Sequence, residues 1–413
     1  MQKNVDVLVI GAGPSGSIAA AILHKAGLKV QVVEKMTFPR FVIGESLLPR
    51  CMEALEEAEL LDAVKAKNFQ QKDGAKFVMN DQICDFNFSQ QFTDGWRWTW
   101  QVPRAEFDKV LADEIVRKGV DIAYQTEVTD VQIFDDHSIT TVKTADGSEE
   151  KIQARFIIDG SGYGRVIPTL FGLNRESTQA PRRAVFCHIT DPKRSEAFEP
   201  NRIIIYVHDP KTWIWVIPFS NGNTSVGYVG DPEFFEKYES EDMATMYRKL
   251  LAAQPELKDR FGDSELAWEQ PRTLQSWSST TDTFYGKGFV LTGNVTEFLD
   301  PVFSSGVTLA SVSAQMAANL VIRHLKGEEI DWENDYMKKM QLGVDVFRTY
   351  VNGWYDGTLF KVFFAENRNP DIMAQICSVL AGYVWDENNP FVKNHEKNVR
   401  TLARYLDTQQ TNA

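Results

Sequence analysis

Cysteine is scarce in this sequence of 413 residues. Its four cysteines, Cys51, Cys84, Cys187 and Cys377, lie far apart and form neither a Cys-x-x-Cys pair nor a cluster with histidine. This spacing argues against a zinc or iron–sulfur centre, so no metal site is predicted. Isolated cysteines are typical of a reducing compartment, and we therefore expect a cytoplasmic protein.

Basic residues are also outnumbered. Lys and Arg total 44 against 57 Asp and Glu, which gives a formal net charge of -13. A chain this acidic is repelled by phosphate backbones and by anionic lipid headgroups. The composition therefore disfavours nucleic-acid binding and a role on a membrane surface.

The sequence lacks a signal peptide and an uninterrupted hydrophobic run of membrane-spanning length. Residues 1–10 have none of the charged, apolar and cleavage regions of a signal peptide. The most apolar long stretch, Gly306 to Ile322, is broken by four polar residues: Ser311, Ser313, Gln315 and Asn319. We therefore expect a buried helix there and no stable insertion in a membrane.

A βαβ unit is predicted at the N-terminus. Apolar residues make up 43% of the chain, which is enough for a large core. Val5 to Ile10 is a continuous apolar run, as in a strand covered on both faces. A helical pattern from Ser15 to Ala26 and a second strand from Lys29 to Glu34 follow.

A Gly-rich motif joins the first strand to the helix. Residues 11–16 read Gly-Ala-Gly-Pro-Ser-Gly and fit GxGxxG. Gly11 permits the tight turn, Gly13 lets a pyrophosphate approach the backbone, and Gly16 lets the helix pack against the strand. Glu34 ends the second strand, where its carboxylate can accept hydrogen bonds from ribose hydroxyls. This context predicts a bound dinucleotide; the alternative is an ordinary glycine turn.

Two later glycine clusters favour FAD over NAD. Gly160 to Gly164 follows a strand that ends in Asp159, and Gly293-Asn294 follows another apolar strand. In a flavoprotein that binds one nucleotide, such strand ends converge on the ribityl chain and the isoalloxazine ring. The N-terminus of the helix at Gly306 would then face the pyrimidine edge of the flavin and stabilise negative charge there.

The rest of the chain divides into a strand-rich part and a helical part. Strands between residues 183 and 229 are long and aromatic, which is typical of a separate antiparallel sheet, and the chain after Gly306 is mainly helical. We predict an α/β fold with three parts: a discontinuous Rossmann-like FAD-binding domain (residues 1–75, 100–175 and 280–330), an inserted antiparallel β-sheet substrate domain (76–99 and 176–279) and a helical C-terminal region (331–413).

Three further segments resemble those of flavin-dependent halogenases, within the class A flavoprotein monooxygenase fold. They are Phe38 to Pro49, Trp213 to Pro218 with the pattern WxWxIP, and Phe298 to Gly306 with spaced Phe, Pro, Ser and Gly. The resemblance covers essentially the whole chain and is strongest to enzymes that act on phenols and pyrroles. It implies an FAD-dependent oxidoreductase that uses reduced FAD, oxygen and halide to halogenate a small electron-rich aromatic. A separate flavin reductase would be its partner.

The same resemblance gives three residues catalytic roles. Lys72 matches the lysine that holds or activates hypohalous acid beside the substrate. Trp213 and Trp215 would lie near the flavin and keep organic substrate away from it. The alternatives are a solvated surface lysine and two tryptophans that only fill the core of a sheet.

The residues expected to contact FAD lie in the glycine motifs or match positions of the family: Gly11, Gly13, Pro14, Ser15, Gly16, Glu34, Lys35, Arg40, Ser46, Arg104, Val128, Asp159, Gly293, Asn294, Pro301, Gly306 and Val307. Backbone N–H groups of Ser305 and Gly306 would hold the halide, although serine is also an ordinary N-cap residue. Many class A enzymes have Gly-Asp in place of Gly293-Asn294, but asparagine can still hydrogen-bond a ribityl hydroxyl.

Two other activities remain open from the sequence. An FAD-dependent monooxygenase and a geranylgeranyl-reductase-like enzyme share this fold, and a flavin-binding protein without enzymatic activity is a third alternative. The acidic net charge disfavours an acidic carrier protein as the bearer of the substrate, unless Arg182-Arg183 and Lys193-Arg194 form a local basic patch. A free small aromatic is therefore the expected substrate.

Overall fold

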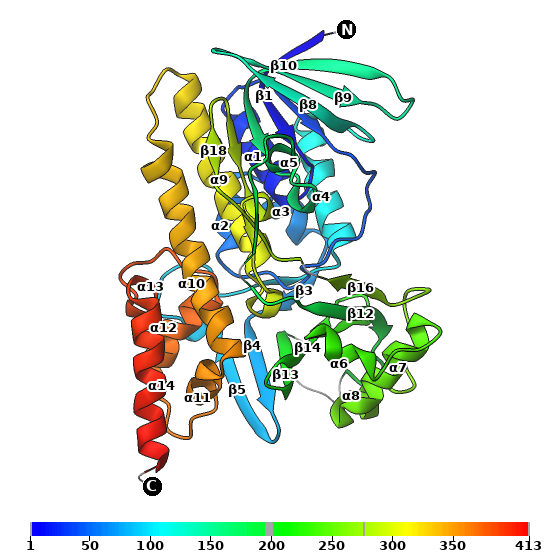
Figure 1. Cartoon of the computed structure of the whole chain (residues 1–413), viewed down its shortest axis with the longest axis vertical. Helices are drawn as coiled ribbons and strands as arrows, with labels where there is room; N and C mark the ends of the chain where they lie inside the picture. The colour runs from blue at the N-terminus through cyan, green and yellow to red at the C-terminus, as the bar shows by residue number, and fades with distance from the viewer. Residues whose placement is uncertain (1, 178, 195–200, 276, 412–413) are drawn as a thin grey trace.

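The computed structural model describes residues 2–177, 179–194, 201–275 and 277–411. Figure 1 shows a sheet flanked by helices at the top, a second sheet with short helices at the lower right, and a group of helices with the C-terminus at the lower left. One sheet is mainly parallel and the other mainly antiparallel, and the C-terminal region is helical. This arrangement confirms the predicted α/β fold class.

The upper sheet is mainly parallel and contains the N-terminal βαβ unit. Its main path is β18-β19-β10-β1-β2-β7, and the β8–β9 hairpin extends from β10. All pairs along this path are parallel except β18–β19. The strands are β1 (Gln2–Ile10), β2 (Val30–Val33), β7 (Asp121–Ala123), β8 (Glu127–Ile133), β9 (Ser138–Lys143), β10 (Glu149–Asp159), β18 (Tyr285–Gly286) and β19 (Phe289–Leu291).

Both faces of β1 are covered, which explains its unbroken apolar run. Val7 and Val9 face a core shared with helices α1 (Pro14–Lys25) and α9 (Ser305–Leu325). Leu8 and Ile10 face the opposite core, which also contains residues of the β8–β9 hairpin and α5 (Val166–Leu170). Helix α4 (Arg104–Arg117) packs against α1.

Helix α9 is long and apolar enough to span a membrane by length and composition alone. However, 67% of its most apolar 18-residue window is buried inside the molecule, where it packs against α1 and α2 (Cys51–Glu57). Packing within the core therefore accounts for its apolar composition, as the interrupted hydrophobic run predicted.

The lower sheet has seven strands in the order β16-β12-β15-β14-β13-β4-β5. Neighbours are antiparallel except β13 and β4, which run parallel. One face packs on the main core and the other on α6 (Pro232–Glu236), α7 (Met243–Ala253) and α8 (Pro255–Phe261). The strands are β4 (Gly74–Met79), β5 (Gln82–Asn87), β12 (Arg183–Thr190), β13 (Arg202–Asp209), β14 (Thr212–Pro218), β15 (Asn223–Gly230) and β16 (Arg272–Gln275).

Two small sheets connect these parts. β3 (Gln70–Lys72) pairs with β6 (Thr99–Gln101), and β17 (Ser279–Thr281) joins β11 (Asn174–Glu176) to β20 (Glu297–Phe298). The pairing of β3 with β6 places Lys72 opposite Thr99, and an isolated bridge places Ser46 opposite Gln101.

The C-terminal helices pack beside β4 and β5. The ring of Phe363 lies 4.9 Å from that of Phe77 and 5.0 Å from that of Phe86. The helices are α10 (Lys338–Tyr355), α11 (Thr358–Phe363), α12 (Pro370–Leu380), α13 (Pro390–Lys393) and α14 (His395–Thr411). The short helix α3 (Leu61–Lys65) packs against α4 in the N-terminal half of the chain.

Candidate functional site

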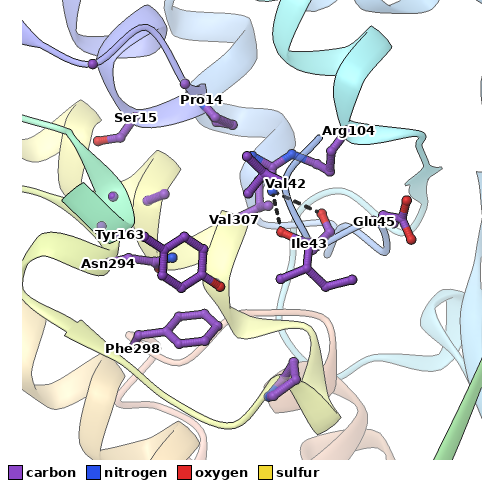
Figure 2. A pocket seen from close by; sticks show the side chains of 18 of the residues that line it. Pro14, Ser15, Val42, Ile43, Glu45, Arg104, Tyr163, Asn294, Phe298 and Val307 are labelled. Carbon is purple, nitrogen blue, oxygen red and sulfur yellow. Dashed lines mark hydrogen bonds between the residues drawn. The ribbon is translucent and has the colours of Figure 1, made fainter. Parts of the chain in front are cut away.

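A deep pocket lies where the carboxyl ends of β1, β10 and β19 meet. It has a volume of about 430 Å³. Ligands of open α/β sheets bind at this edge. In Figure 2 the Gly-rich turn, with Pro14 and Ser15, forms one end of the pocket. One wall carries Tyr163, Asn294 and Phe298, and the other carries Val42, Ile43 and Arg104.

Most of the predicted cofactor residues line this pocket. They are Gly11, Gly13, Pro14, Ser15, Glu34, Lys35, Arg40, Ser46, Arg104, Gly293, Asn294, Pro301, Gly306 and Val307, together with Trp213 and Trp215. The structure therefore brings the three glycine clusters and the three halogenase-like segments to one place.

The Gly-rich turn has no room for side chains. Gly11 has a φ of +92°, and a Cβ there would lie 2.7 Å from the carbonyl oxygen of Gly160. A Cβ on Gly16 would lie 1.8 Å from the carbonyl oxygen of Gly11. Gly16 does not line the pocket; it lies behind the turn, where it lets α1 approach β1.

Glu34 is fixed at the edge of the pocket by backbone donors. The N–H groups of Ala12 and Met36 each donate to one of its carboxylate oxygens, both at 2.9 Å. The side chain is buried but lines the pocket. A carboxylate held in this way keeps lone pairs available for the hydroxyls of a ribose.

Two arginines share one buried carboxylate beside the Gly-rich turn. Asp108 accepts hydrogen bonds from Arg104 Nε at 2.7 Å and Arg104 Nη2 at 2.9 Å, and from Arg40 Nη1 at 3.0 Å. The other nitrogen of Arg40, Nη2, lies 3.2 Å from the Cβ position of Gly13. One excess positive charge therefore faces the turn, where it suits the phosphates of a dinucleotide.

Arg104 also binds the backbone of the loop at Ile43 and Gly44. Its Nη1 donates to the carbonyl oxygens of Ile43 at 2.9 Å and Gly44 at 3.3 Å, as the dashed lines in Figure 2 show. It thus holds the loop that forms one wall of the pocket. The sequence pattern did not single out Asp108, although its spacing of four from Arg104 on a helix is the available signal.

The opposite wall is built from the ends of β10 and β19. Ser15 Oγ donates to Thr292 Oγ1 at 2.7 Å, and the Gly293 N–H donates to Ser313 Oγ at 2.8 Å. Asn294 lines the pocket, and its carbonyl oxygen accepts from Arg165. Tyr163 also lines it, with its ring edge-on to Phe298 at 5.2 Å; the sequence pattern gave no role to either ring.

Several predicted residues lie outside the pocket lining. Asp159 is fully buried, and its carboxylate accepts from the N–H groups of Ser161 and Ile167, so it shapes the glycine loop from behind. Burial raises the pKa of Asp159. Val128 lies in β8 and packs on the core at the opposite face of the upper sheet, which keeps it away from the pocket.

The segment before α9 presents its backbone to the pocket. Pro301, Ser304 and Gly306 line it, whereas Ser305 is buried at the first position of α9 and does not. Ser304 has a φ of 57° and turns the chain into the helix. Of the two residues expected to hold a halide, the structure places only Gly306 on the pocket wall.

Trp213 and Trp215 lie side by side in β14, with ring centroids 5.9 Å apart. Both line the pocket, and both belong to the buried core of the lower sheet. Filling the sheet core and forming the pocket wall are therefore not alternatives here, because the sheet face that carries the two rings is itself the wall.

Lys72 is not a surface lysine. Only 1% of it is exposed, and its Nζ donates to the carbonyl oxygen of Leu47 at 2.7 Å. Burial lowers the pKa of Lys72 to about 7. It does not line the pocket, but Ser46, the neighbour of its hydrogen-bond acceptor, does.

Strand pairing places a row of buried polar residues between Lys72 and the pocket. Lys72 pairs with Thr99 across β3 and β6, and Gln101 pairs with Ser46. Directly opposed residues share a face of a sheet, as do residues two apart on a strand. These four buried residues, called here the polar row, therefore run along one face from the pocket wall at Ser46 to the amine.

Residues 4–331 match the protein family described as FAD binding domain. A crystal structure described as a flavoprotein/dehydrogenase, from Cytophaga hutchinsonii, is 55% identical with a TM-score of 0.96, over 99% of this chain and 100% of that one. The 1H-pyrrole-2-carbonyl-(peptidyl-carrier protein) brominase of Pseudoalteromonas luteoviolacea is 27% identical over 93% of each chain. The structure of the myxobacterial chondrochloren halogenase is 25% identical with a TM-score of 0.73, over 98% of this chain and 97% of that one.

Proposed function

The chain belongs to the FAD-binding domain family, and from this we propose that it is a flavin-dependent halogenase of a small, electron-rich aromatic compound. FAD is its cofactor, and the halogenases related to it over nearly its whole length make it an FAD-dependent oxidoreductase of that type, as the sequence predicted. Bound FAD, once reduced, supplies the electrons with which oxygen and halide yield hypohalous acid.

The pocket residues fit FAD as the bound group. Glu34 would accept from the ribose of the adenosine half, and the N–H groups at the start of α1 would hold the pyrophosphate with Arg40. Asn294 and the backbone of the segment before α9 would hold the flavin half, with Trp213 and Trp215 as the wall beside it. These assignments rest on the lining of the pocket and on the glycine positions that a Cβ would block.

The observation that carries halogenation is the state of Lys72. Its amine is buried, and among the described residues it forms no ion pair with a carboxylate. With a pKa of about 7, a large share of the side chain is neutral near neutral pH and has a free lone pair on nitrogen. The polar row lies between this amine and the pocket where hypohalous acid would form.

A free aromatic compound suits the surface better than a substrate on an acidic carrier protein. Each cation of the candidate basic patch already pairs with a carboxylate: Arg182 with Asp231, Arg183 with Glu239, Lys193 with Asp259 and Arg194 with Asp191. Asp231 is shared with Lys211 and Asp191 with Arg260, so the pairing reduces the positive charge of the patch without cancelling it. The net charge of -13 adds repulsion at longer range.

Three further parts of the proposal concern the setting of the enzyme. A separate flavin reductase would supply reduced FAD, because the sequence holds one dinucleotide motif. Halide would be bound near Gly306 at the start of α9. The four cysteines are buried and unpaired, which supports the expected cytoplasmic location.

The test is a product assay with purified protein, FAD, a flavin reductase, oxygen, chloride or bromide, and a panel of phenols, pyrroles and indoles. We expect halogenated product from the wild type and none from Lys72→Ala, with FAD binding unchanged because Lys72 lies outside the pocket lining. Lys67→Ala, a change at an exposed lysine five residues earlier, is the matched control and should retain activity. Hydroxylated product would assign a monooxygenase, and reduction of bound FAD by substrate without oxygen would assign a dehydrogenase.

A further inference from the structure

The two tryptophans of the pocket wall are anchored in different parts of the molecule. Trp215 Nε1 donates to Ser225 Oγ at 3.0 Å, on the neighbouring strand β15 of the same sheet. Trp213 Nε1 donates instead to the hydroxyl of Tyr355 at 3.0 Å. Tyr355 is the last residue of α10, so one wall residue depends on the C-terminal helices and the other does not.

The hydroxyl of Tyr355 is also hydrogen-bonded to a buried carboxylate, that of Asp300. It donates to Asp300 Oδ2 at 2.9 Å, and Asp300 Oδ1 accepts from the Val302 N–H at 3.1 Å. A phenol hydroxyl has one hydrogen, so it accepts from Trp213 while it donates to Asp300. The three groups form one directed chain from the indole N–H to the carboxylate, called here the Trp213–Asp300 relay.

The relay joins three separate segments of the chain, two of which contribute residues to the pocket wall. Trp213 belongs to β14, Tyr355 to α10, and Asp300 directly precedes Pro301, which also lines the pocket. Asp300 is 2% exposed, and Trp213 is equally buried. Each polar atom of the relay has a protein partner.

Few charges face the carboxylate. Arg182 lies with its guanidinium carbon 4.0 Å from the centre of the Tyr355 ring, and it also forms an ion pair with Asp231, which in turn pairs with Lys211. Burial raises the pKa of Asp300 to about 6, with Tyr355 and Arg182 acting in the opposite direction. The acceptor at the end of the relay therefore changes its charge at mildly acidic pH.

We propose that Tyr355 and Asp300 are positioning residues, which hold the indole of Trp213 in place as the wall of the flavin site while Asp300 is ionised. Protonation of Asp300 adds a competing donor to the relay and weakens its acceptor, so the indole is released from its fixed orientation. This inference needs FAD binding but not halogenation, so it stands or falls separately from the proposed reaction.

The test uses the emission of oxidised FAD bound to the full chain, because an indole held against a flavin quenches its fluorescence. We expect strong quenching in the wild type above neutral pH, and a severalfold rise in emission as the pH falls through about 6. Tyr355→Phe keeps the ring beneath Arg182 but removes the hydroxyl, and it should emit strongly at every pH without a transition. Trp213→Phe keeps the second indole of the wall, Trp215, and therefore sets the emission that is expected when Trp213 alone no longer quenches.

Tyr350→Phe is the matched control. Tyr350 lies on the same helix and is fully buried, but its hydroxyl has no hydrogen-bond partner among the described residues, so its loss should leave the wild-type pH profile intact. Equal emission and equal pH profiles in Tyr355→Phe and the wild type, with FAD bound in both, would overturn the proposal. If Tyr355→Phe does not bind FAD, Asp300→Asn decides, because a transition that persists without the carboxylic acid also contradicts the relay.

Discussion

At the scale of single residues, the side chain with the strongest consequence is Lys72. An amine that is 1% exposed has lost its hydration, and one carbonyl oxygen replaces only part of it. The residue therefore carries a cost to folding. That cost depends on pH, because it falls on the charged form alone.

We predict that Lys72→Met changes how stability depends on pH. The pKa of Lys72 falls from 10.5 in the unfolded chain to about 7 in the folded one, so the unfolded chain binds more protons between these values. The stabilising contribution of the neutral amine is thus gained as the pH rises through this window, by at most about 1.4 kcal/mol per pH unit. Lys72→Met should lack this rise and should be the more stable protein below pH 7.

Urea unfolding of both proteins across this pH range measures the effect. Only the difference between the two curves matters, since all other titrating groups are common to both. Parallel curves for the wild type and Lys72→Met would show that the amine stays charged in the folded state.

Some residues of the site can be identified from the sequence and others cannot. Gly11 and Gly13 are readable because the dinucleotide turn demands glycine at fixed spacings. Tyr355 is not readable in this way, because a buried phenol has no characteristic spacing, and Asp108 leaves only its helical spacing of four from Arg104. Tyr355 lies 142 residues from Trp213, and only the fold brings the two together.

At the scale of elements, Gly13 and Gly16 have different roles in the strand–turn–helix unit of β1 and α1. A Cβ on Gly16 would meet the backbone oxygen of Gly11 at 1.8 Å, and backbone cannot move away without breaking the turn. A Cβ on Gly13 would meet only the end of the Arg40 side chain at 3.2 Å, which is flexible. Gly16 is therefore required by the fold, and Gly13 is required by the ligand.

We predict that Gly13→Ala and Gly16→Ala therefore fail differently. Gly13→Ala should unfold at nearly the wild-type temperature but bind FAD at least about tenfold more weakly, a loss of about 1.4 kcal/mol. Gly16→Ala should lower the melting temperature and lose FAD as well, because overpacking of this kind costs about 1–3 kcal/mol or more. Thermal unfolding without FAD, followed by titration with FAD, distinguishes the two. A wild-type melting temperature for Gly16→Ala would contradict the close packing of α1 on β1.

Elements with strong local patterns could be predicted, and those fixed by distant pairing could not. β1, α1 and α9 have apolar runs or helical spacing that determine them locally. The parallel pairing of β4 with β13 joins residues about 128 positions apart along the chain, such as Gly74 and Arg202. No local pattern encodes it, and the same holds for the pairing of β3 with β6 that gives Lys72 its place.

At the scale of the whole molecule, the pocket is assembled from both sheets. Gly11 and Thr292 directly follow β1 and β19 of the upper sheet, and Trp213 and Ile217 lie in β14 of the lower one. A ligand in this pocket contacts both and binds only when both are folded. Ligand binding should therefore stabilise the two sheets as one unit.

We predict that FAD at a hundredfold excess over its Kd stabilises the chain by about 2.7 kcal/mol. Hydrogen exchange should slow in β14 as well as in β1, because opening either sheet releases the ligand. Mass spectrometry of peptides with and without FAD measures this directly. Slower exchange in the N-terminal unit alone would mean that the lower sheet does not take part in binding.

The distribution of the pocket along the chain also bears on how the protein is made. The wall begins at Gly11, continues through Trp213 and the segment before α9, and is anchored by Tyr355 near the end of the chain. On the ribosome, the N-terminal βαβ unit emerges long before the residues that enclose the flavin. A growing chain therefore has no complete enclosure for a redox cofactor until most of the chain has been synthesised.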